Sequence, residues 1–368
     1  MRVFQLLPTL ALGDAVSNDT IAIAKVLRDM GFQTGIFAEN IDKRLPAGIA
    51  RPVSKMPRLG SGDVILYHLS VGSELNFNLE KYPCRKGIIY HNITPSYFFQ
   101  PYNGDLTELL DYGRKGVRHL ADKADFCMAD SAYNKQELRE LGYTCEISVR
   151  PILIPFSDYA QRPDAEILRQ YDSDGFTNFL FVGRIAPNKK HEDIIRTFYC
   201  YQKHCNPRSR LILVGSWQGT ELYYKRLQRY VQALELQNVI FTGHVSFAEM
   251  IAYYQIADLF LCMSEHEGFC VPLVEAMHFG VPIMAYAASA VPDTLGGAGV
   301  LLHDKDPLEA AMTADRILRD TVLRREIIAQ QRKRQQDFSY NDVRRQFEQQ
   351  LRHFLKMPGG CEDASLYH

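Results

Sequence analysis

Several features that commonly reveal a protein's class are scarce or missing in this chain. Its 368 residues include eight cysteines but no Cys-x-x-Cys pair, and Cys200 and Cys205 lack the His or Cys partners of a zinc site. A net charge of -1 gives no overall attraction to nucleic acid. There is no signal-peptide pattern and no apolar run as long as a membrane span. We therefore expect reduced thiols and a cytoplasmic location.

The composition is that of an ordinary folded enzyme. Apolar residues make up 46% of the chain and charged residues 23%, which is enough to bury large cores. A chain of 368 residues exceeds one typical core, so two domains are expected. Two prolines between Arg150 and Tyr159 indicate a hinge.

Apolar runs and helical patterns alternate along both halves, which predicts parallel sheets covered on both faces. We place strands at residues 2–7, 32–37, 63–68, 87–91, 124–129, from about 179, and at 210–214, 239–241, 258–263 and 282–285. We place helices from an N-cap at Asn18 or Asp19 to about Met30, after a cap at Ser131, and at 222–236, 247–255, 308–334 and 341–355.

The most informative segment contains Glu267 and Glu275, with seven residues between them. Glu267 follows a predicted buried strand, and Pro272 and Gly280 mark the start and end of a short helix that carries Glu275. This places Glu267 at the carboxyl edge of a sheet, where open α/β folds bind ligands. Carboxylates there can accept hydrogen bonds from sugar hydroxyls. The alternative is a capped helix with solvated acids.

A second segment carries cations behind a strand. Gly183 allows a close approach of the backbone, Arg184 offers a planar fork for phosphate oxygens, and Lys189 offers a point charge. Together these residues suit a diphosphate. Taken alone, the segment fits a surface loop of solvated bases equally well.

The two segments, with two further motifs that lie between them in the same order, resemble glycosyltransferase family 4, a family of retaining sugar transferases with the GT-B fold. The matching stretches are residues 182–189, 214–216, 241–245 and 267–277, with the last one carrying Glu-Gly-Phe and the Glu-Ala-Met end. The resemblance covers about half of the chain strongly and the N-terminal half in outline. Lys190 and Cys270 each stand where the family usually has glycine, and the second departure bears on the turn around the donor sugar.

The resemblance implies an α/β GT-B architecture of two Rossmann-like, doubly wound domains facing a central cleft. We place the N-terminal, acceptor-side domain at residues 1–155 and the nucleotide-sugar domain at 156–338. A helix at 339–356 would cross back to the N-terminal domain, and 357–368 would form a flexible tail.

The resemblance also implies roles for individual residues. Arg184 and Lys189 would stabilise charge on the leaving diphosphate, and Glu267 would hold donor-sugar hydroxyls. Glu275 would bind the ribose, and Val245 would lie near the base. Further donor contacts would come from Gly183, Phe269, Cys270 and Val271.

Three residues of the N-terminal half are candidates for contacts with the donor sugar, its phosphates or the acceptor. His91 ends a strand, and the family often has a histidine there that faces the donor sugar; a structural histidine is the alternative. Gly13 and Asp14 follow the first strand, where they would contact phosphates or acceptor, or simply form a flexible turn.

We therefore expect a hexosyltransferase that uses a GDP- or UDP-linked sugar and needs no cofactor or metal. A Tyr-His-Asn-Ile-Thr-Pro run beginning at Tyr90 resembles bacterial mannosyltransferases of surface-polysaccharide assembly, which favours mannose. The acceptor would be a glycan or a lipid-linked glycan. Other reactions on the GT-B fold stay open, namely a nucleotide-sugar epimerase or a glycan phosphorylase, as does a non-catalytic sugar-nucleotide-binding protein.

Two further patterns are explained by local structure without a ligand. The Asp-x-Asp pairs beginning at Asp172 and Asp304 lie in polar turns and are better explained by turn chemistry than by a metal. A basic stretch contains Arg114, Lys115, Arg118, His119 and Lys123; it is typical of a solvated helix face, with peripheral contact to acidic lipids at the inner face of the membrane as the alternative.

Overall fold

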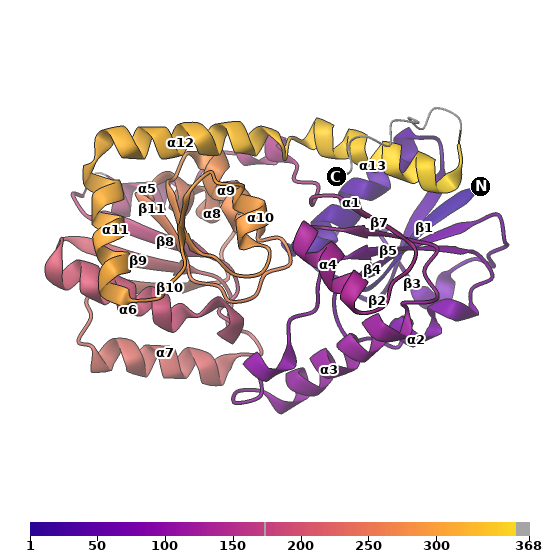
Figure 1. Ribbon diagram of the computed structural model, residues 1–368, viewed down its shortest axis with the longest axis horizontal. Helices are drawn as coiled ribbons and strands as arrows, with labels where there is room; N and C mark the ends of the chain where they lie inside the picture. Colours follow the sequence, from indigo (N-terminus) through magenta and orange to yellow (C-terminus); the bar gives the residue numbers. More distant parts are fainter. Residues whose placement is uncertain (173, 358–368) are drawn as a thin grey trace. The chain divides into compact units, whose positions relative to one another are not determined.

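The computed structural model describes residues 1–172 and 174–357, which form two compact units (Figure 1). Unit 1 comprises Met1–Ser96, Thr107–Phe156 and the C-terminal segment from Asp337. Unit 2 comprises Tyr97–Leu106 and Ser157–Gln336. Most of the tail predicted at 357–368 lies outside the described residues.

Unit 1 is a parallel sheet covered by helices. Among the described residues the sheet has seven strands in the order β3-β2-β1-β4-β5-β6-β7. The strands are β1 (Arg2–Leu10), β2 (Gln33–Ile41), β3 (Arg51–Pro52), β4 (Val64–Leu69), β5 (Arg85–Tyr90), β6 (Phe126–Ala129) and β7 (Glu146–Val149). The helices are α1 (Ala15–Asp29), α2 (Leu75–Asn78), α3 (Gly104–His119, of which unit 1 contains the part from Thr107), α4 (Ala132–Glu140) and α13 (Tyr340–Leu355). The strand order reverses between β1 and β4.

Unit 2 repeats this logic with a sheet of six described strands, ordered β10-β9-β8-β11-β12-β13. The strands are β8 (Thr177–Val182), β9 (Ser209–Val214), β10 (Val239–Gly243), β11 (Leu259–Cys262), β12 (Ile283–Tyr286) and β13 (Val300–Leu302). The helices are α5 (Ala165–Tyr171), α6 (His191–His204), α7 (Glu221–Ala233), α8 (Phe247–Gln255), α9 (Val271–Phe279), α10 (Val291–Leu295), α11 (Pro307–Arg319) and α12 (Thr321–Gln336). Here the order reverses between β8 and β11.

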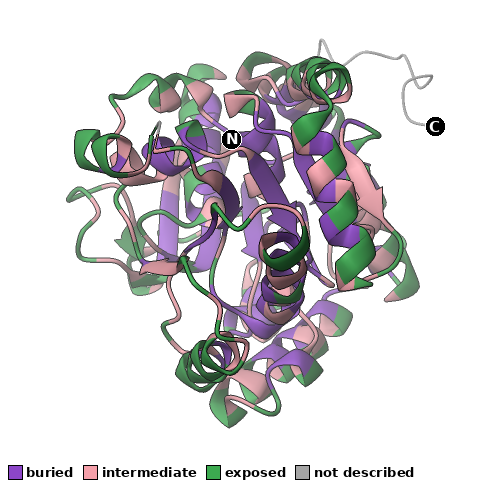
Figure 2. Cartoon of the chain, turned by 90° about the vertical axis from the view of Figure 1, so that its left-hand side faces the viewer, coloured by how far each residue is buried: buried purple, intermediate pink, exposed green. Residues whose placement is uncertain are grey.

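The burial pattern explains why the strands read as apolar runs. Figure 2 shows buried strands flanked by helices that mix buried and exposed residues. Both faces of each parallel sheet are covered, so the strands alternate little between apolar and polar residues. The prediction of two doubly wound α/β domains is confirmed.

No helix in the described part of the chain is both long and apolar enough to cross a membrane.

The last helix belongs to unit 1, although α12 before it belongs to unit 2. Phe347 and Leu351 of α13 are fully buried in a core cluster with Val3 and Ile23. Phe354 stacks on Phe126 with ring centroids 4.4 Å apart. This confirms the predicted return of the C-terminal helix to the N-terminal half.

Some sequence-based boundaries are wrong for local reasons. The N-cap of α1 is Asp14, whose carboxylate accepts from the Ser17 N–H at 2.9 Å, so Asn18 and Asp19 lie inside the helix. The helix predicted at 308–334 is two helices. Asp320 separates them, and its carboxylate accepts from the N–H groups of Val322 and Leu323 at the start of α12.

The segment Tyr97–Leu106 belongs to unit 2, although its chain neighbours on both sides belong to unit 1. Tyr102 packs edge-on against Tyr223, and the Asn103 side chain donates to the Gly219 carbonyl at 2.9 Å. The sequence-based division at residue 155 places this segment in the N-terminal domain. It misses the assignment to unit 2 because the contacts responsible join residues that are distant in sequence.

Candidate functional site

The central feature of unit 2 is an ion pair between Lys189 and Glu267. Lys189 ends a short 3-10 turn after β8, and Glu267 lies in the loop after β11. These strands pair in parallel at the point where the strand order reverses, so both loops emerge at one edge. Lys189 Nζ lies 2.5 Å from Glu267 Oε2, and the side chains are 20% and 7% exposed.

The pair is strong enough to keep the lysine charged. Burial alone lowers the pKa of Lys189, but the charge of Glu267 outweighs it and raises the pKa above its ordinary value. An ammonium group has three donors, so Lys189 can hold Glu267 and a second anion together.

Hydrogen bonds between the two loops fix the position of Glu267. The Asn188 side chain donates to the His266 carbonyl at 3.0 Å, and the Glu265 N–H donates to the Asn188 carbonyl at 2.9 Å. The Glu267 N–H donates to the hydroxyl of Ser289 at 2.7 Å. The sequence prediction missed Asn188 and Ser289, because an asparagine and a serine in loops carry no distinctive pattern.

Arg184 lies at the same edge of the sheet. It directly follows Gly183, where the loop after β8 approaches the loop after β9 closely. A Cβ atom on Gly215 would lie 2.0 Å from the carbonyl oxygen of Gly183, so this contact requires a glycine at position 215. Arg184 is exposed and donates through Nη2 to the Gln218 carbonyl at 2.8 Å. No carboxylate in the described part of the chain forms an ion pair with Arg184. Its guanidinium is therefore suited to receive an anionic ligand.

Glu275 lies in α9 and is held by two tyrosines that the sequence prediction missed. Tyr159 and Tyr254 donate to its two carboxylate oxygens at 2.6 and 2.7 Å. Burial raises the pKa of Glu275, and the tyrosine hydrogen bonds oppose that rise. Each oxygen keeps a second lone pair, so the predicted contact with a ribose stays a prediction.

The turn that opens α9 is unusual for its residue type. Cys270 is the N-cap and has φ 72° and ψ 65°, a left-handed conformation that normally selects glycine. The carbonyl of the buried Phe269 accepts from the Thr294 hydroxyl. The turn thus keeps a glycine-like backbone although a cysteine replaces the family's glycine. The donor contacts predicted for Phe269, Cys270 and Val271 stay predictions, as does that of Val245, which is half-buried between β10 and α8.

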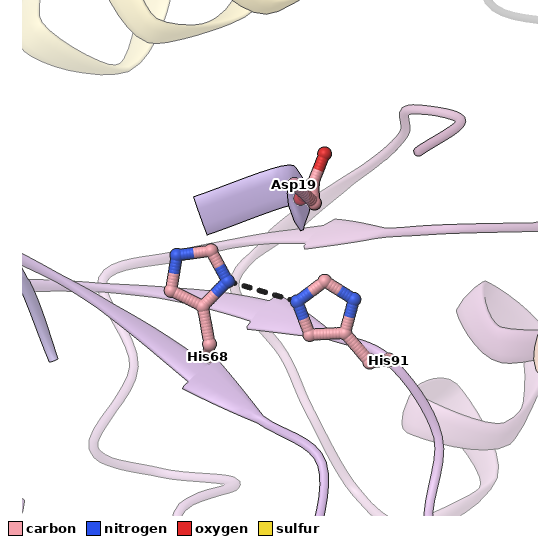
Figure 3. Close-up of side chains that lie close together, drawn as sticks. All are labelled: Asp19, His68 and His91. Carbon is pink, nitrogen blue, oxygen red and sulfur yellow. Dashed lines mark hydrogen bonds between the residues drawn. The ribbon is translucent and has the colours of Figure 1, made fainter. Parts of the chain in front are cut away.

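His91 lies in a buried polar network of unit 1. Its Nδ1 is 2.7 Å from Asp130 Oδ2, and its Nε2 is 2.9 Å from His68 Nδ1. The other ring nitrogen of His68 is 2.9 Å from Gln5 Oε1. Figure 3 shows the two imidazole rings joined by their hydrogen bond, with Asp19 beside them.

The direction of these hydrogen bonds sets the charge of His91. The Gln5 oxygen accepts, so His68 donates from Nε2 and accepts at Nδ1 when it is neutral. Burial lowers the pKa of His68 well below its usual value, which keeps it neutral. His91 must then donate from both nitrogens. Burial lowers the pKa of His91, but Asp130 raises it above the ordinary value overall.

This geometry favours the structural alternative for His91. Its side chain is 2% exposed, and both nitrogens are occupied as donors. It can therefore neither accept a proton nor offer a vacant donor to a sugar in this arrangement. Direct contact with a donor sugar stays a prediction, and so do the roles of Gly13 and Asp14. The carboxylate of Asp14 is already used to cap α1.

The network also contains a fully buried ion pair. Both side chains of Arg150 and Asp19 are 0% exposed, and the guanidinium binds the carboxylate through two hydrogen bonds of 2.9 and 2.7 Å. The Leu153 N–H donates to the same carboxylate at 2.8 Å. Asp19, His68 and His91 are close enough to hold a metal ion, but the bidentate arginine already satisfies Asp19. We therefore assign this cluster to structure.

The remaining polar patterns have structural explanations. Asp174 accepts from the Phe176 N–H and from Arg210, and Asp306 caps α11, contacts that are typical of polar turns. Within the basic stretch, Arg114 pairs with Glu137 at 3.0 Å, whereas Lys115 and Arg118 are exposed. Lipid contact by this face stays a prediction.

Comparison with known proteins shows which sugar transferases this chain resembles. Residues 165–334 match the family model of glycosyl transferases group 1. Over 201 residues the chain is 25% identical to O-antigen chain mannosyltransferase B of Escherichia coli, covering 53% of this chain and 52% of that protein. Over 152 residues it is 30% identical to a GDP-mannose-dependent alpha-mannosyltransferase of Mycolicibacterium smegmatis, covering 41% and 36%. The chain thus spans about half or less of the curated relatives it matches.

Solved structures share the fold. HepE from Anabaena, crystallised with UDP and glucose, superposes with a TM-score of 0.77 at 19% identity, covering 96% of this chain and all of that one. Sucrose-phosphate synthase from Thermosynechococcus elongatus gives 0.72 at 18% identity over 97% of this chain and all of that one. The chain is therefore similar to group 1 glycosyl transferases over residues 165–334, has the two-sheet α/β fold of GT-B transferases, and resembles bacterial mannosyltransferases.

Proposed function

We propose that this chain is a retaining, metal-independent hexosyltransferase of glycosyltransferase family 4. It moves a hexose, mannose as our specific choice, from a nucleotide-diphospho-sugar to a glycan or lipid-linked glycan. The observation that carries the proposal is the Lys189–Glu267 pair at the strand-order reversal of unit 2, with Arg184 on the adjoining loop. We further propose that the reaction takes place in the cytoplasm.

In this proposal, the cationic side chains bind the diphosphate of the donor and the carboxylate binds its sugar. Arg184 and Lys189 bind the diphosphate, whose negative charge grows as it leaves, so they stabilise the transition state more than the ground state. Glu267 accepts hydrogen bonds from the hydroxyls of the sugar. In the proposed retaining reaction, the acceptor oxygen bonds to the anomeric carbon as the bond to the diphosphate breaks. The acceptor proton passes to the leaving phosphate.

The choice of mannose rests on the relatives. One is named for mannose transfer in O-antigen chains and another for dependence on GDP-mannose. A solved neighbour holds UDP and glucose, so a UDP-linked donor is the main competitor.

The test is a thermal-shift screen of GDP- and UDP-linked sugars, followed by an assay of nucleotide release with and without glycan acceptors. The proposal expects stabilisation by GDP-mannose and release that depends on acceptor. Release of free sugar that ignores acceptor would indicate the epimerase-type alternative. Binding without turnover, with any acceptor, would indicate the non-catalytic alternative. The anomeric configuration of the product, read by NMR, tests retention.

A further inference from the structure

Two thiols and a carboxylate converge in the same region of unit 2. Cys262 ends β11, Glu267 lies in the following loop, and Cys270 opens α9. One ligand atom from each lies within 4.8 Å of the other two. All three residues are buried, at 0%, 7% and 7% exposure. The carboxylate is the one that pairs with Lys189.

This arrangement matches the preferences of a soft divalent cation. Thiolates select Zn²⁺ and similar ions over Mg²⁺ and Ca²⁺. Two sulfurs about 2.3 Å from a tetrahedral ion lie about 3.8 Å from each other. The sulfur atoms of Cys262 and Cys270 lie within 4.8 Å of each other, and the Cys262 thiol donates to the Ser264 hydroxyl at 3.3 Å. A small movement of the side chains would bring the two sulfurs to the separation that the ion requires. Glu267 supplies an oxygen as the third ligand.

The cluster differs from the other thiol pair of the structure. Cys127 and Cys145 of unit 1 have sulfurs 3.6 Å apart, but no carboxylate or histidine joins them in a described metal-binding group. The cluster of Asp19 with two histidines has no thiol, and Arg150 binds both oxygens of its carboxylate, whereas Lys189 binds Oε2 of Glu267. Only the unit 2 group combines soft ligands with a carboxylate among the described residues.

We propose that Cys262, Glu267 and Cys270 form an inhibitory site for a thiophilic divalent cation such as Zn²⁺. Binding releases the two thiol protons and places two thiolates and one carboxylate oxygen on the ion. Glu267 is then drawn from Lys189 and from the donor sugar. The binding site stands on the geometry alone, whereas the inhibition rests on the proposed transferase function.

The test is a titration of the metal-free protein, kept reduced by a phosphine, with Cd²⁺ as an optical substitute for Zn²⁺. The signal is the ultraviolet charge-transfer band of Cd²⁺ bound to thiolate. We expect a saturable band in the unmodified chain and competition by Zn²⁺. In Cys270→Gly we expect Cd²⁺ affinity to fall by at least about tenfold. Glycine suits the left-handed backbone at this position, so the variant is expected to fold.

Two further variants make the result decisive. Cys262→Ala should weaken Cd²⁺ as Cys270→Gly does, and Cys145→Ala, which breaks the unit 1 thiol pair, should leave the band intact. An unchanged affinity in Cys270→Gly, or a band that disappears in Cys145→Ala, would overturn the site.

Turnover with and without Zn²⁺ is then compared within each protein. Loss of Zn²⁺ inhibition in Cys262→Ala supports the inhibitory role. Zn²⁺ binding with no effect on turnover of the unmodified chain would overturn the inhibition and leave the binding site standing. Failure of the transferase proposal itself is distinguished separately, since it would leave no turnover to inhibit while the Cd²⁺ band persisted.

Discussion

Replacing Glu267 by glutamine should remove most of the turnover while leaving the fold intact. Glutamine keeps the shape of the side chain and an acceptor oxygen for Lys189, but it removes the charge that pairs at 2.5 Å. A hydrogen bond to a charged group contributes about 1.5–3 kcal/mol, which corresponds to a rate change of roughly 10- to 150-fold. In the proposed reaction, Glu267 binds the sugar hydroxyls close to the bond that breaks, where charge develops in the transition state. We therefore expect the substitution to lower kcat more than it raises KM.

The assay measures kcat and KM with the sugar nucleotide that the thermal-shift screen identifies. Glu265→Gln is the matched control, since Glu265 is also an ion-paired carboxylate of this loop, bound to Lys190 and Lys305 and 34% exposed. Partly exposed pairs contribute under about 1 kcal/mol, so we expect a change of less than about fivefold. Equal kinetics for Glu267→Gln and the unmodified chain, both folded, would refute the role of Glu267.

Three other predictions concern stability, acid sensitivity and metal. Arg150→Met leaves the buried carboxylate of Asp19 unpaired and should lower the free energy of unfolding by about 3–5 kcal/mol in urea titrations, whereas Arg44→Met, at an exposed pair, should cost under about 1 kcal/mol. Burial lowers the pKa of His191 to about 3. The unfolded chain binds this proton near pH 6.5, so stability should fall as pH drops from about 6.5 toward 3, by about 1.4 kcal/mol per pH unit, and His191→Leu should reduce that slope. A slope equal to that of the unmodified chain would contradict this. Activity should survive EDTA, and complete loss that Mg²⁺ restores would instead indicate a metal role for an Asp-x-Asp turn such as the one at Asp304.

The sequence predicts features that follow from local pattern. Alternating apolar runs and helices are enough to give two parallel sheets, because each strand must be covered on both faces. The carboxyl ends of β8 and β11 share one edge, so the approach of Lys189 to Glu267 follows from the strand assignments. The apolar sequence neighbours of Cys127, Cys262 and Cys270 likewise favour core positions, and all three residues are buried.

Features that depend on distant partners could not be predicted. The tyrosines on Glu275 lie 116 and 21 residues from it, and Arg150 lies 131 residues from Asp19. The placement of Tyr97–Leu106 in unit 2 and the burial of His91 depend on such contacts as well. A strand-end histidine has the same sequence pattern whether it faces a ligand or a buried aspartate. Only the fold distinguishes these two cases.

The central claim is that Arg184 and Lys189 bind the diphosphate of a nucleotide sugar. Isothermal titration of GDP-mannose and UDP-glucose into the protein, in buffer containing EDTA, tests this claim most directly. We predict measurable binding of one of them, and an affinity that is at least about tenfold lower in Lys189→Met. Affinity should also fall in Arg184→Ala. Arg184→Lys should restore only part of that loss, because a lysine lacks the planar fork of the guanidinium. Binding of equal affinity in the unmodified chain, Lys189→Met and Arg184→Ala would contradict the account.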